Sequence, residues 1–175
     1  EISKLYWHIP PDLPWDHGTG QGLPYPTYAF ACVVAEVRVD VETGSVEVLK
    51  ITSGHDVGTV VNPSLAAGQV YGGIAMGMGM GIMEAVEFSQ GDISNPNLDE
   101  YIIPTSADMP QAVPVIYESN DPTGPFGAKS LGEGASECVA AAIVNAIADA
   151  TGRRIRDLPA NLERVLLGKN LVRAK

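Results

Sequence analysis

Hydrophobic and polar residues alternate in the first half of the chain, and this alternation predicts a β-hairpin. In residues 28–40, apolar side chains at every second position would face one side of an extended strand. These positions are Ala31, Val33, Ala35, Val37 and Val39. A turn follows at Glu42, Thr43 and Gly44, and residues 45–53 resume the strand pattern. We therefore expect two antiparallel strands with one buried and one hydrated face.

The pattern changes to that of a long helix at residues 64–86. Pro63 precedes this segment, and proline is favoured in the first turn of a helix. Gly73, Gly77 and Gly81 recur every four residues. They would lie on one side of the helix, where the lack of side chains lets a neighbouring element come close. The helix is therefore expected to pack tightly in a protein core.

The apolar character of this segment raises the alternative of a membrane span. Residues 65–83 carry no charge, and about 20 apolar residues can cross a bilayer. However, five glycines between residues 72 and 81 lower the hydropathy. Neither a cationic flank nor an aromatic belt accompanies the segment. We therefore favour a buried helix over a membrane helix.

The second half of the chain is expected to complete a sheet. Residues 95–109 read as a loop with local strand character at 101–103, and residues 113–119 read as a strand. Together with the hairpin and the long helix, these elements predict an α+β fold. It would consist of a β-hairpin and mixed sheet packed with a long glycine-rich helix and an alanine-rich C-terminal helix.

The alanine-rich helix follows residue 136 and runs to about Ala150. Gly152 supplies its end signal, and Asn161 can cap a last short helix that ends near Gly168. Residues 1–25 are rich in proline and aromatic side chains, which resist regular structure. We expect residues 1–175 to form a single domain with residues 1–25 as an irregular N-terminal segment.

Charge and cysteine content narrow the possible partners of the chain. Its 175 residues carry 11 Lys and Arg against 21 Asp and Glu, a net charge of −10. An acidic surface disfavours nucleic acid and anionic membranes, which attract basic proteins. Cys32 and Cys138 lie far apart in apolar runs, so we expect two reduced, buried thiols in a cytoplasmic protein. A zinc site is not expected, because neither cysteine has a close Cys or His neighbour.

Residues 121–137, DPTGPFGAKSLGEGASE, combine a glycine turn with a cation, a hydroxyl and a carboxylate. A strand is expected before this stretch and a helix after it, and in such turns backbone N–H groups point at a ligand. Three interpretations compete: a solvated loop, a phosphate-binding P-loop, and an active-site loop in which Glu133 acts as a base. The P-loop pattern fails because Ala128 precedes Lys129 where glycine is required. The other two interpretations stay open on the residues alone.

Several motifs in the same order resemble the molybdopterin-binding subunit of the xanthine dehydrogenase and aldehyde oxidoreductase family. They are HDVGTVVNPSLAAGQVYGGIAMGMG (residues 55–79), NPNLDEYIIPTSADMP (95–110), GAKSLGE (127–133) and TGRRIRDLPANLERVL (151–166). The resemblance runs from about Thr19 onward and is to the C-terminal part of that subunit. It implies a molybdenum-containing oxidoreductase that hydroxylates an activated carbon with oxygen from water.

The resemblance also implies roles for individual residues. Glu133 would be the general base that takes a proton from a molybdenum-bound hydroxide. Gln69, in the helix start AAGQVYGG, would lie next to the cofactor; on the residues alone, it could instead bond to nearby backbone if buried. The cofactor contacts implied in the glycine turn are those of Lys129, Ser130, Leu131 and Gly132. No molybdenum ligand is implied in this chain, because the family holds the metal through the pterin.

Cofactors and partners follow from the same resemblance. Molybdenum–molybdopterin, in its plain or cytosine dinucleotide form, would bind at this chain, with iron–sulfur clusters and FAD on partner chains or domains. The partners would be the remainder of the molybdenum subunit, an iron–sulfur subunit, an FAD subunit and a small-molecule substrate. That substrate would be a purine, an N-heterocycle or an aldehyde. The chain opens at Glu1 without Met, so we expect a piece of a larger subunit that is inactive alone.

Two departures from the family pattern bear on the shape of the loop and on the substrate. Many relatives have Gly-Val where this chain has Ser130-Leu131, and proline often follows the glutamate where Gly134 stands. An alternative of a different class is a non-catalytic remnant or interaction domain that keeps the fold without cofactor. Glu133 and Gln69 favour the enzyme, since a remnant has no physical need of either.

Overall fold

A three-stranded mixed sheet forms the centre of the molecule. The computed structural model describes residues 2–167. The strand order is β3 (Ala31–Val39), β4 (Val46–Asp56), β7 (Gln111–Tyr117). β3 and β4 are antiparallel, as the alternation predicted, whereas β4 and β7 are parallel. The predicted α+β fold with a hairpin and a mixed sheet is thus confirmed.

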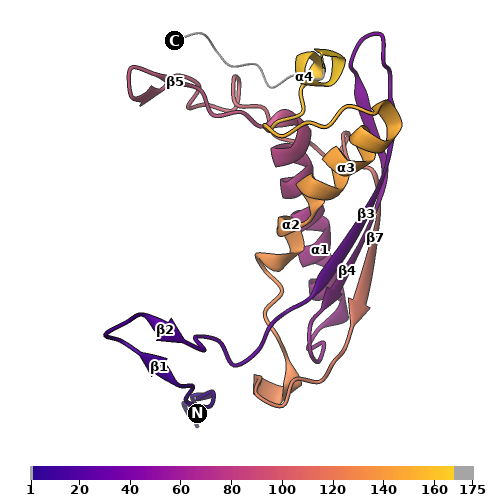
Figure 1. Ribbon diagram of the computed structural model, residues 1–175. Helices are drawn as coiled ribbons and strands as arrows, with labels where there is room; N and C mark the ends of the chain where they lie inside the picture. The colour runs from indigo at the N-terminus through magenta and orange to yellow at the C-terminus, as the bar shows by residue number, and fades with distance from the viewer. Residues whose placement is uncertain (1, 168–175) are drawn as a thin grey trace.

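Two long helical segments cover one face of this sheet (Figure 1). The first is α1 (Pro63–Met78), which continues as the π-helical turn Gly79–Met83. The second consists of α2 (Gly134–Glu137) and α3 (Val139–Thr151). α3 packs against β3, and α1 packs against β7. None of the helices within residues 2–167 is long and apolar enough to span a membrane.

Residues from both helical segments and from the sheet meet in one hydrophobic core. Its fully buried members include Ile51 from β4, Ile74 from α1 and Ile143 from α3. The remaining core residues are Val48, Val70, Met78, Val139, Ile147, Ile155, Ala160 and Val165. Four of the five predicted inward-facing residues of β3 pack against this cluster, namely Val33, Ala35, Val37 and Val39, whereas Ala31 is exposed.

The glycine ridge of α1 is the contact surface between the two helical segments. The contacts pair Gly73 with Ala135, Gly77 with Val139, and Gly81 with Ala140. A Cβ atom added to Gly73 would stand only 2.5 Å from the carbonyl carbon and oxygen of Ala135. The predicted close packing is therefore confirmed. Because the residue numbers rise together along both segments, the helices run in the same direction and their N-terminal ends lie at one end of the pair.

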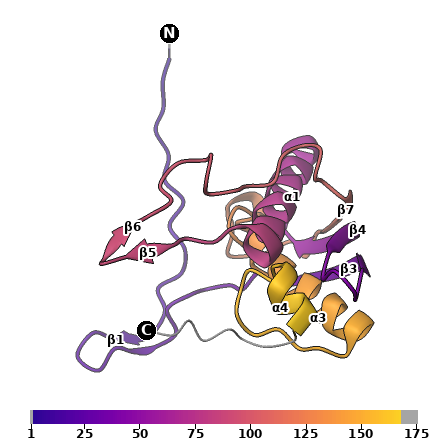
Figure 2. The same ribbon diagram turned by 90° about the horizontal axis from the view of Figure 1, so that it is seen from above.

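Two short hairpins project from the helix side of the molecule (Figures 1 and 2). β1 (Trp15–Asp16) pairs with β2 (Gln21–Gly22) in the N-terminal segment, which otherwise has no regular structure between residues 2 and 30. β5 (Phe88–Ser89) pairs with β6 (Asp92–Ile93) after the π-helical turn. The expected irregular N-terminal segment therefore contains a single small hairpin.

The ends of the helices were predicted with mixed success. Gly152 ends α3 in a left-handed conformation (φ 70°), and Asn161 Oδ1 accepts a hydrogen bond from the Arg164 N–H (3.0 Å) at the start of α4 (Leu162–Leu167), as expected. The predicted end near Gly168 lies outside the described residues. The long helix stops at Met83 and not at residue 86, where the Glu84 N–H closes the π-helical turn on the Gly79 carbonyl (2.8 Å).

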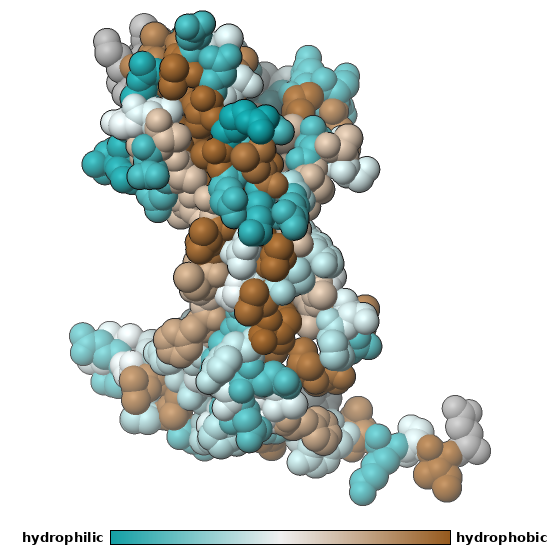
Figure 3. Space-filling view, turned by 90° about the vertical axis from the view of Figure 1, so that its right-hand side faces the viewer, coloured by the Kyte–Doolittle hydropathy of each residue, from teal (hydrophilic) through white to brown (hydrophobic). Residues whose placement is uncertain are grey.

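Two other expectations were wrong. Residues 101–103 form no strand, because no neighbouring strand pairs with them in the described part of the chain. Both cysteines are free thiols, but Cys32 is exposed and Cys138 is only partly buried. Cys32 lies on β3 between the inward-facing positions, so its side chain points to the face of the sheet that no described helix covers. Hydrophobic side chains gather in patches on this side of the molecule (Figure 3).

Candidate active site

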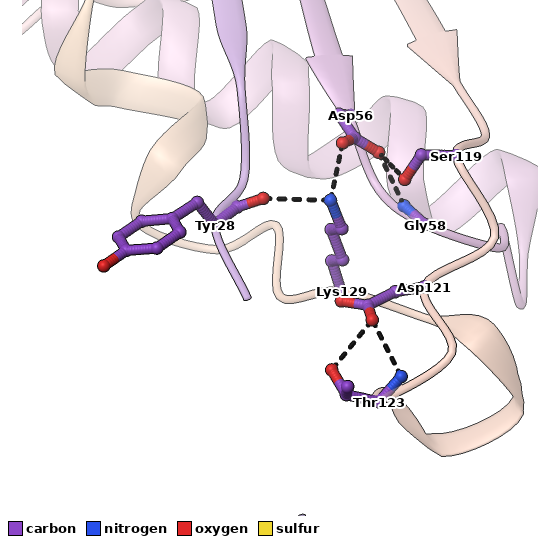
Figure 4. A network of polar contacts seen from close by, with 7 residues as sticks. All are labelled: Tyr28, Asp56, Gly58, Ser119, Asp121, Thr123 and Lys129. Atoms are coloured by element: carbon purple, nitrogen blue, oxygen red, sulfur yellow. Dashed lines mark hydrogen bonds and ion pairs between the residues drawn. The ribbon is translucent and has the colours of Figure 1, made fainter. Parts of the chain in front are cut away.

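The site is organised around a buried ion pair at the end of β4. The Lys129 ammonium lies 2.7 Å from Asp56 Oδ2 and donates a second hydrogen bond to the Tyr28 carbonyl (2.9 Å). The other carboxylate oxygen, Asp56 Oδ1, accepts hydrogen bonds from Ser119 Oγ (2.6 Å) and from the Gly58 N–H (3.0 Å). Figure 4 shows these groups converging from the ends of β4 and β7 and from the segment before β3. β4 and β7 are parallel, so their carboxyl ends bring Asp56 and Ser119 to the same edge of the sheet.

This environment keeps the Asp56 carboxylate ionised. The two side chains are only 6% (Asp56) and 9% (Lys129) exposed. Burial by itself raises the pKa of Asp56, but the hydrogen bonds from Lys129, Ser119 and Gly58, with the charge of the ammonium, outweigh it. The net effect lowers the pKa of Asp56 to about 2. The Asp56 carboxylate is therefore ionised at neutral pH.

Backbone hydrogen bonds attach the glycine turn to the loop that follows β4. The Lys129 N–H donates to the Val57 carbonyl (2.9 Å), and the Thr59 N–H donates to the Gly127 carbonyl (2.7 Å). Gly58 has a left-handed backbone (φ 65°), and a Cβ atom there would collide with the Gly127 carbonyl oxygen. Glycine is thus required at position 58 both by the backbone conformation and by the close approach of the two loops.

Asp121 organises the tip of the turn. Its Oδ1 accepts hydrogen bonds from the N–H and the hydroxyl of Thr123, each 2.8 Å long (Figure 4). The Asp121 N–H in turn donates to the Gly127 carbonyl (3.0 Å). Between these anchors, Phe126 has a left-handed backbone (φ 56°) and a side chain that is 94% exposed. The tip is thus held from within, and it presents an aromatic ring to the outside.

The four residues after Lys129 form the turn that was predicted to meet the cofactor, and we call residues 130–133 the base turn. Ser130 and Leu131 line a cavity of about 170 Å³, together with His55 and Cys138. Gly132 has no neighbouring heavy atom within 4 Å of the position of a Cβ atom. Glu133 stands directly before α2 and is exposed. Its carboxylate has no hydrogen bond or ion pair with any residue from 2 to 167.

Gln69 lies at the same end of the helix pair as Glu133. It sits one helical turn before Gly73, which touches Ala135, and Glu133 is two residues before Ala135. Gln69 is exposed, and its carboxamide has no hydrogen-bond partner among the described residues. The alternative of a buried Gln69 bonded to nearby backbone is therefore wrong. The carboxamide is available to a ligand.

The Lys129 ammonium is largely engaged within the chain. The resemblance implied a contact with the pterin, but two of the three N–H donors of the ammonium are engaged by Asp56 and Tyr28. Its role towards a cofactor stays a prediction. Asp56, Ser119 and Tyr28 were not recognised as partners from the sequence. The only signal was a carboxylate directly after a strand and before a glycine in HDVG.

The exposed groups at this end fit the polar edges of a pterin. Four glycines have open space where a Cβ atom would stand: Gly68 and Gly72 on α1, Gly132 in the base turn and Gly134 directly after it. The side chains of Gln69, Ser130 and Glu133 carry donors and acceptors without partners among the described residues. Within residues 2–167, no group of three or more His, Cys, Asp or Glu side chains is placed to hold a metal ion.

Comparisons with known proteins show the family of the chain. The molybdopterin cofactor-binding domain family matches residues 3–110. The putative xanthine dehydrogenase molybdenum-binding subunit XdhA of Escherichia coli (strain K12) is 41% identical over 139 residues, which are 78% of this chain and 18% of that protein. The aldehyde oxidoreductase of Megalodesulfovibrio gigas is 39% identical over 153 residues, 86% of this chain and 16% of that protein.

A solved structure of similar shape is the aldehyde oxidoreductase from Desulfovibrio gigas. It matches with a TM-score of 0.78 and 37% identity, over 89% of this chain and 17% of that chain. In each of these comparisons the present chain spans less than a fifth of the length of the protein that it matches.

Proposed function

The chain belongs to the molybdopterin cofactor-binding domain family and is part of the molybdenum-binding subunit of a molybdenum hydroxylase, and from this premise we propose that it carries the general base of the enzyme, Glu133. The observation that supports this proposal is the position of two unpartnered polar side chains. The Glu133 carboxylate and the Gln69 carboxamide are exposed at the same end of the helix pair.

The residues at this end divide the work with the cofactor. When bound, molybdenum–molybdopterin supplies the redox chemistry that puts an oxygen atom from water into a C–H bond of the substrate. Gln69 would donate and accept hydrogen bonds at the polar edge of the pterin. Ser130, Leu131 and Gly132 would offer their backbone groups and the Ser130 hydroxyl, since the described residues leave these unbonded.

Glu133 would accept the proton that the attacking oxygen gives up. A carboxylate without an ion pair can take a proton without first breaking a salt bridge. Its backbone is constrained because the Glu133 carbonyl accepts hydrogen bonds from the N–H (3.0 Å) and the hydroxyl (3.0 Å) of Ser136 in α2. Glu133 is thus the last residue of the base turn and directly precedes α2, which packs closely against α1 at Gly73.

The substrate and the assembly are part of the same proposal. The substrate is a purine, an N-heterocycle or an aldehyde, and the relatives that match include proteins named for xanthine and for aldehydes. The partners are the remainder of the molybdenum subunit and the subunits or domains that carry iron–sulfur clusters and FAD. The protein would act in the cytoplasm.

The test is a Glu133→Gln variant of the complete enzyme that contains this chain, with Glu163→Gln as the matched control. Glu163 is exposed on α4, outside the cavity that Ser130 and Leu131 line. We expect Glu133→Gln to lower kcat by about 10²–10⁴-fold, with molybdenum content and melting temperature unchanged, and Glu163→Gln to keep its activity. A Glu133→Gln enzyme that turns over like the wild type would exclude Glu133 as the base.

Metal content separates this proposal from a non-catalytic remnant. Elemental mass spectrometry of the native complex, purified through a tag on this chain, should find near-stoichiometric molybdenum together with iron. A folded complex without molybdenum would favour the remnant.

A further inference from the structure

The ion pair between Asp56 and Lys129 differs from the other ion pairs of the described residues in being buried. The Arg38–Glu47 and Glu36–Lys50 pairs lie on the β3–β4 hairpin, and their side chains are 36–71% exposed. Asp56 and Lys129, in contrast, are almost completely removed from solvent. Their pairing joins two segments that lie 73 residues apart in the chain.

Stability alone is a poor reason to bury such a pair. Removing two charges from water costs about as much free energy as their attraction returns, and apolar residues of similar size often serve equally well. A hydrogen-bonded charged pair does, however, fix the orientation of its two side chains. Lys129 is held from two sides by Asp56 and Tyr28, and Asp56 is held by Ser119 and Gly58, so the geometry of both side chains is determined.

The base turn depends on this anchor because it has few others. Among the described residues, the backbone N–H and carbonyl groups of Ser130, Leu131 and Gly132 form no hydrogen bonds. The last backbone bond before the turn is the one from the Lys129 N–H to Val57 (2.9 Å). The next constraint is the pair of hydrogen bonds that the Glu133 backbone carbonyl accepts from Ser136. Lys129 therefore sets where the turn begins, and α2 sets where it ends.

We propose that Asp56 and Lys129 are positioning residues that place the base turn, and with it the Glu133 carboxylate, at the end of the helix pair. This inference rests on the proposed function of Glu133. Neither residue needs to touch substrate or cofactor for this role. A displacement of about 1 Å at a reacting group can cost about 100-fold in rate, so a loosened anchor is expected to act on turnover more than on folding.

The decisive variant replaces both charges by apolar side chains, Asp56→Leu with Lys129→Met, in the complete enzyme. No charge is left unpaired, so the melting temperature should fall only moderately, through the buried Gly58 N–H that loses its acceptor. We expect kcat to fall about 10–100-fold. The N–H groups of residues 128 and 129 are hydrogen-bonded to Pro125 and Val57 in the wild type, and their amide hydrogen exchange, followed by mass spectrometry, should become faster. The matched control is Arg38→Met with Glu47→Leu, an exposed pair on the hairpin, which should change neither quantity.

A second variant covers the case in which the double replacement fails to fold. Ser119→Ala removes only the hydroxyl that donates to Asp56 Oδ1, and Ser119 is itself an exposed residue. It should speed the exchange of the hydrogen-bonded N–H groups of residues 128 and 129 and lower kcat a few-fold. Wild-type kcat and exchange in a folded variant of either kind would overturn the proposal. The exchange measurement does not depend on Glu133, so a wrong assignment of the base would be recognised separately by the Glu133→Gln enzyme.

Discussion

The contact between Gly73 and Ala135 allows a sharp prediction about the helix pair. In a Gly73→Ala variant, the new methyl group would stand 2.5 Å from the carbonyl carbon and oxygen of Ala135 and 2.6 Å from its Cβ. Carbon atoms in normal contact are about 3.5–4.0 Å apart, so the two helices must separate by about 1 Å. A backbone carbonyl within a helix cannot turn aside as a side chain can. The separation must therefore be taken up by the packing around it.

The expected free-energy change combines two opposing effects. Overpacking of this kind costs about 1–3 kcal/mol, and the rigid neighbour favours the upper end. Alanine in place of glycine within a helix stabilises by about 1 kcal/mol. We therefore expect Gly73→Ala to lower the free energy of unfolding by about 2 kcal/mol.

Gly72 is the matched control on the same helix. A Cβ atom at Gly72 has no neighbouring heavy atom within 4 Å, so Gly72→Ala should give only the helix benefit and stabilise by about 0.5–1 kcal/mol. Urea unfolding of both variants, monitored by circular dichroism, measures the difference. If Gly73→Ala is as stable as Gly72→Ala, the helices are not in the close contact described, and the reasoning from the glycine ridge is refuted.

Two further predictions concern the buried pair and the core. The pKa of Asp56 is lowered to about 2 from 3.8. The ionised carboxylate therefore contributes its full stabilisation above pH 4, and this contribution is lost as the pH falls through 2. The shift in pKa corresponds to at most about 2 kcal/mol of the free energy of unfolding. In urea titrations between pH 5 and pH 2, the wild type should therefore lose its advantage over Asp56→Asn, and a constant gap would contradict the stated pKa. Ile143 is fully buried, so Ile143→Ala should lower the free energy of unfolding by about 2–5 kcal/mol. Ile102 is 49% exposed, and Ile102→Ala should change it by no more than about 0.5 kcal/mol; equal effects of the two substitutions in the same urea assay would place the core elsewhere.

Local patterns in the sequence predicted the elements that depend on near neighbours. The alternation from Ala31 to Val39 gave the buried side of β3, and the four-residue spacing of Gly73, Gly77 and Gly81 gave the side of α1 that packs. The same alternation already contradicted the expectation that Cys32 is buried. Cys32 stands between Ala31 and Val33, and therefore on the other face of the strand. The position of Cys32 in the alternation, and not the apolar composition around it, determines its exposure.

Features that depend on distant residues could not be predicted in this way. Asp56 and Lys129 lie 73 residues apart, and nothing in the local sequence shows that parallel pairing of β4 with β7 brings them together. The aspartate, and its pairing with the lysine, were therefore missed. Residues 101–103 have the composition of a strand but no partner strand in the described structure. The placement of Glu133 and Gln69 at one end required the parallel direction of the helix pair, which follows from the tertiary contacts.

The position of β4 between its two neighbours has a consequence for the order in which the protein folds. β3 reaches β4 through a short turn, so this pair can form as soon as both strands leave the ribosome. β7 pairs with β4 only after α1 and the following loops have been made. Until then one edge of β4 is open, and open edges are where strands pair wrongly. We expect the buried charge pair to close only after residue 129 has emerged, so the candidate active site would assemble later than the β3–β4 hairpin.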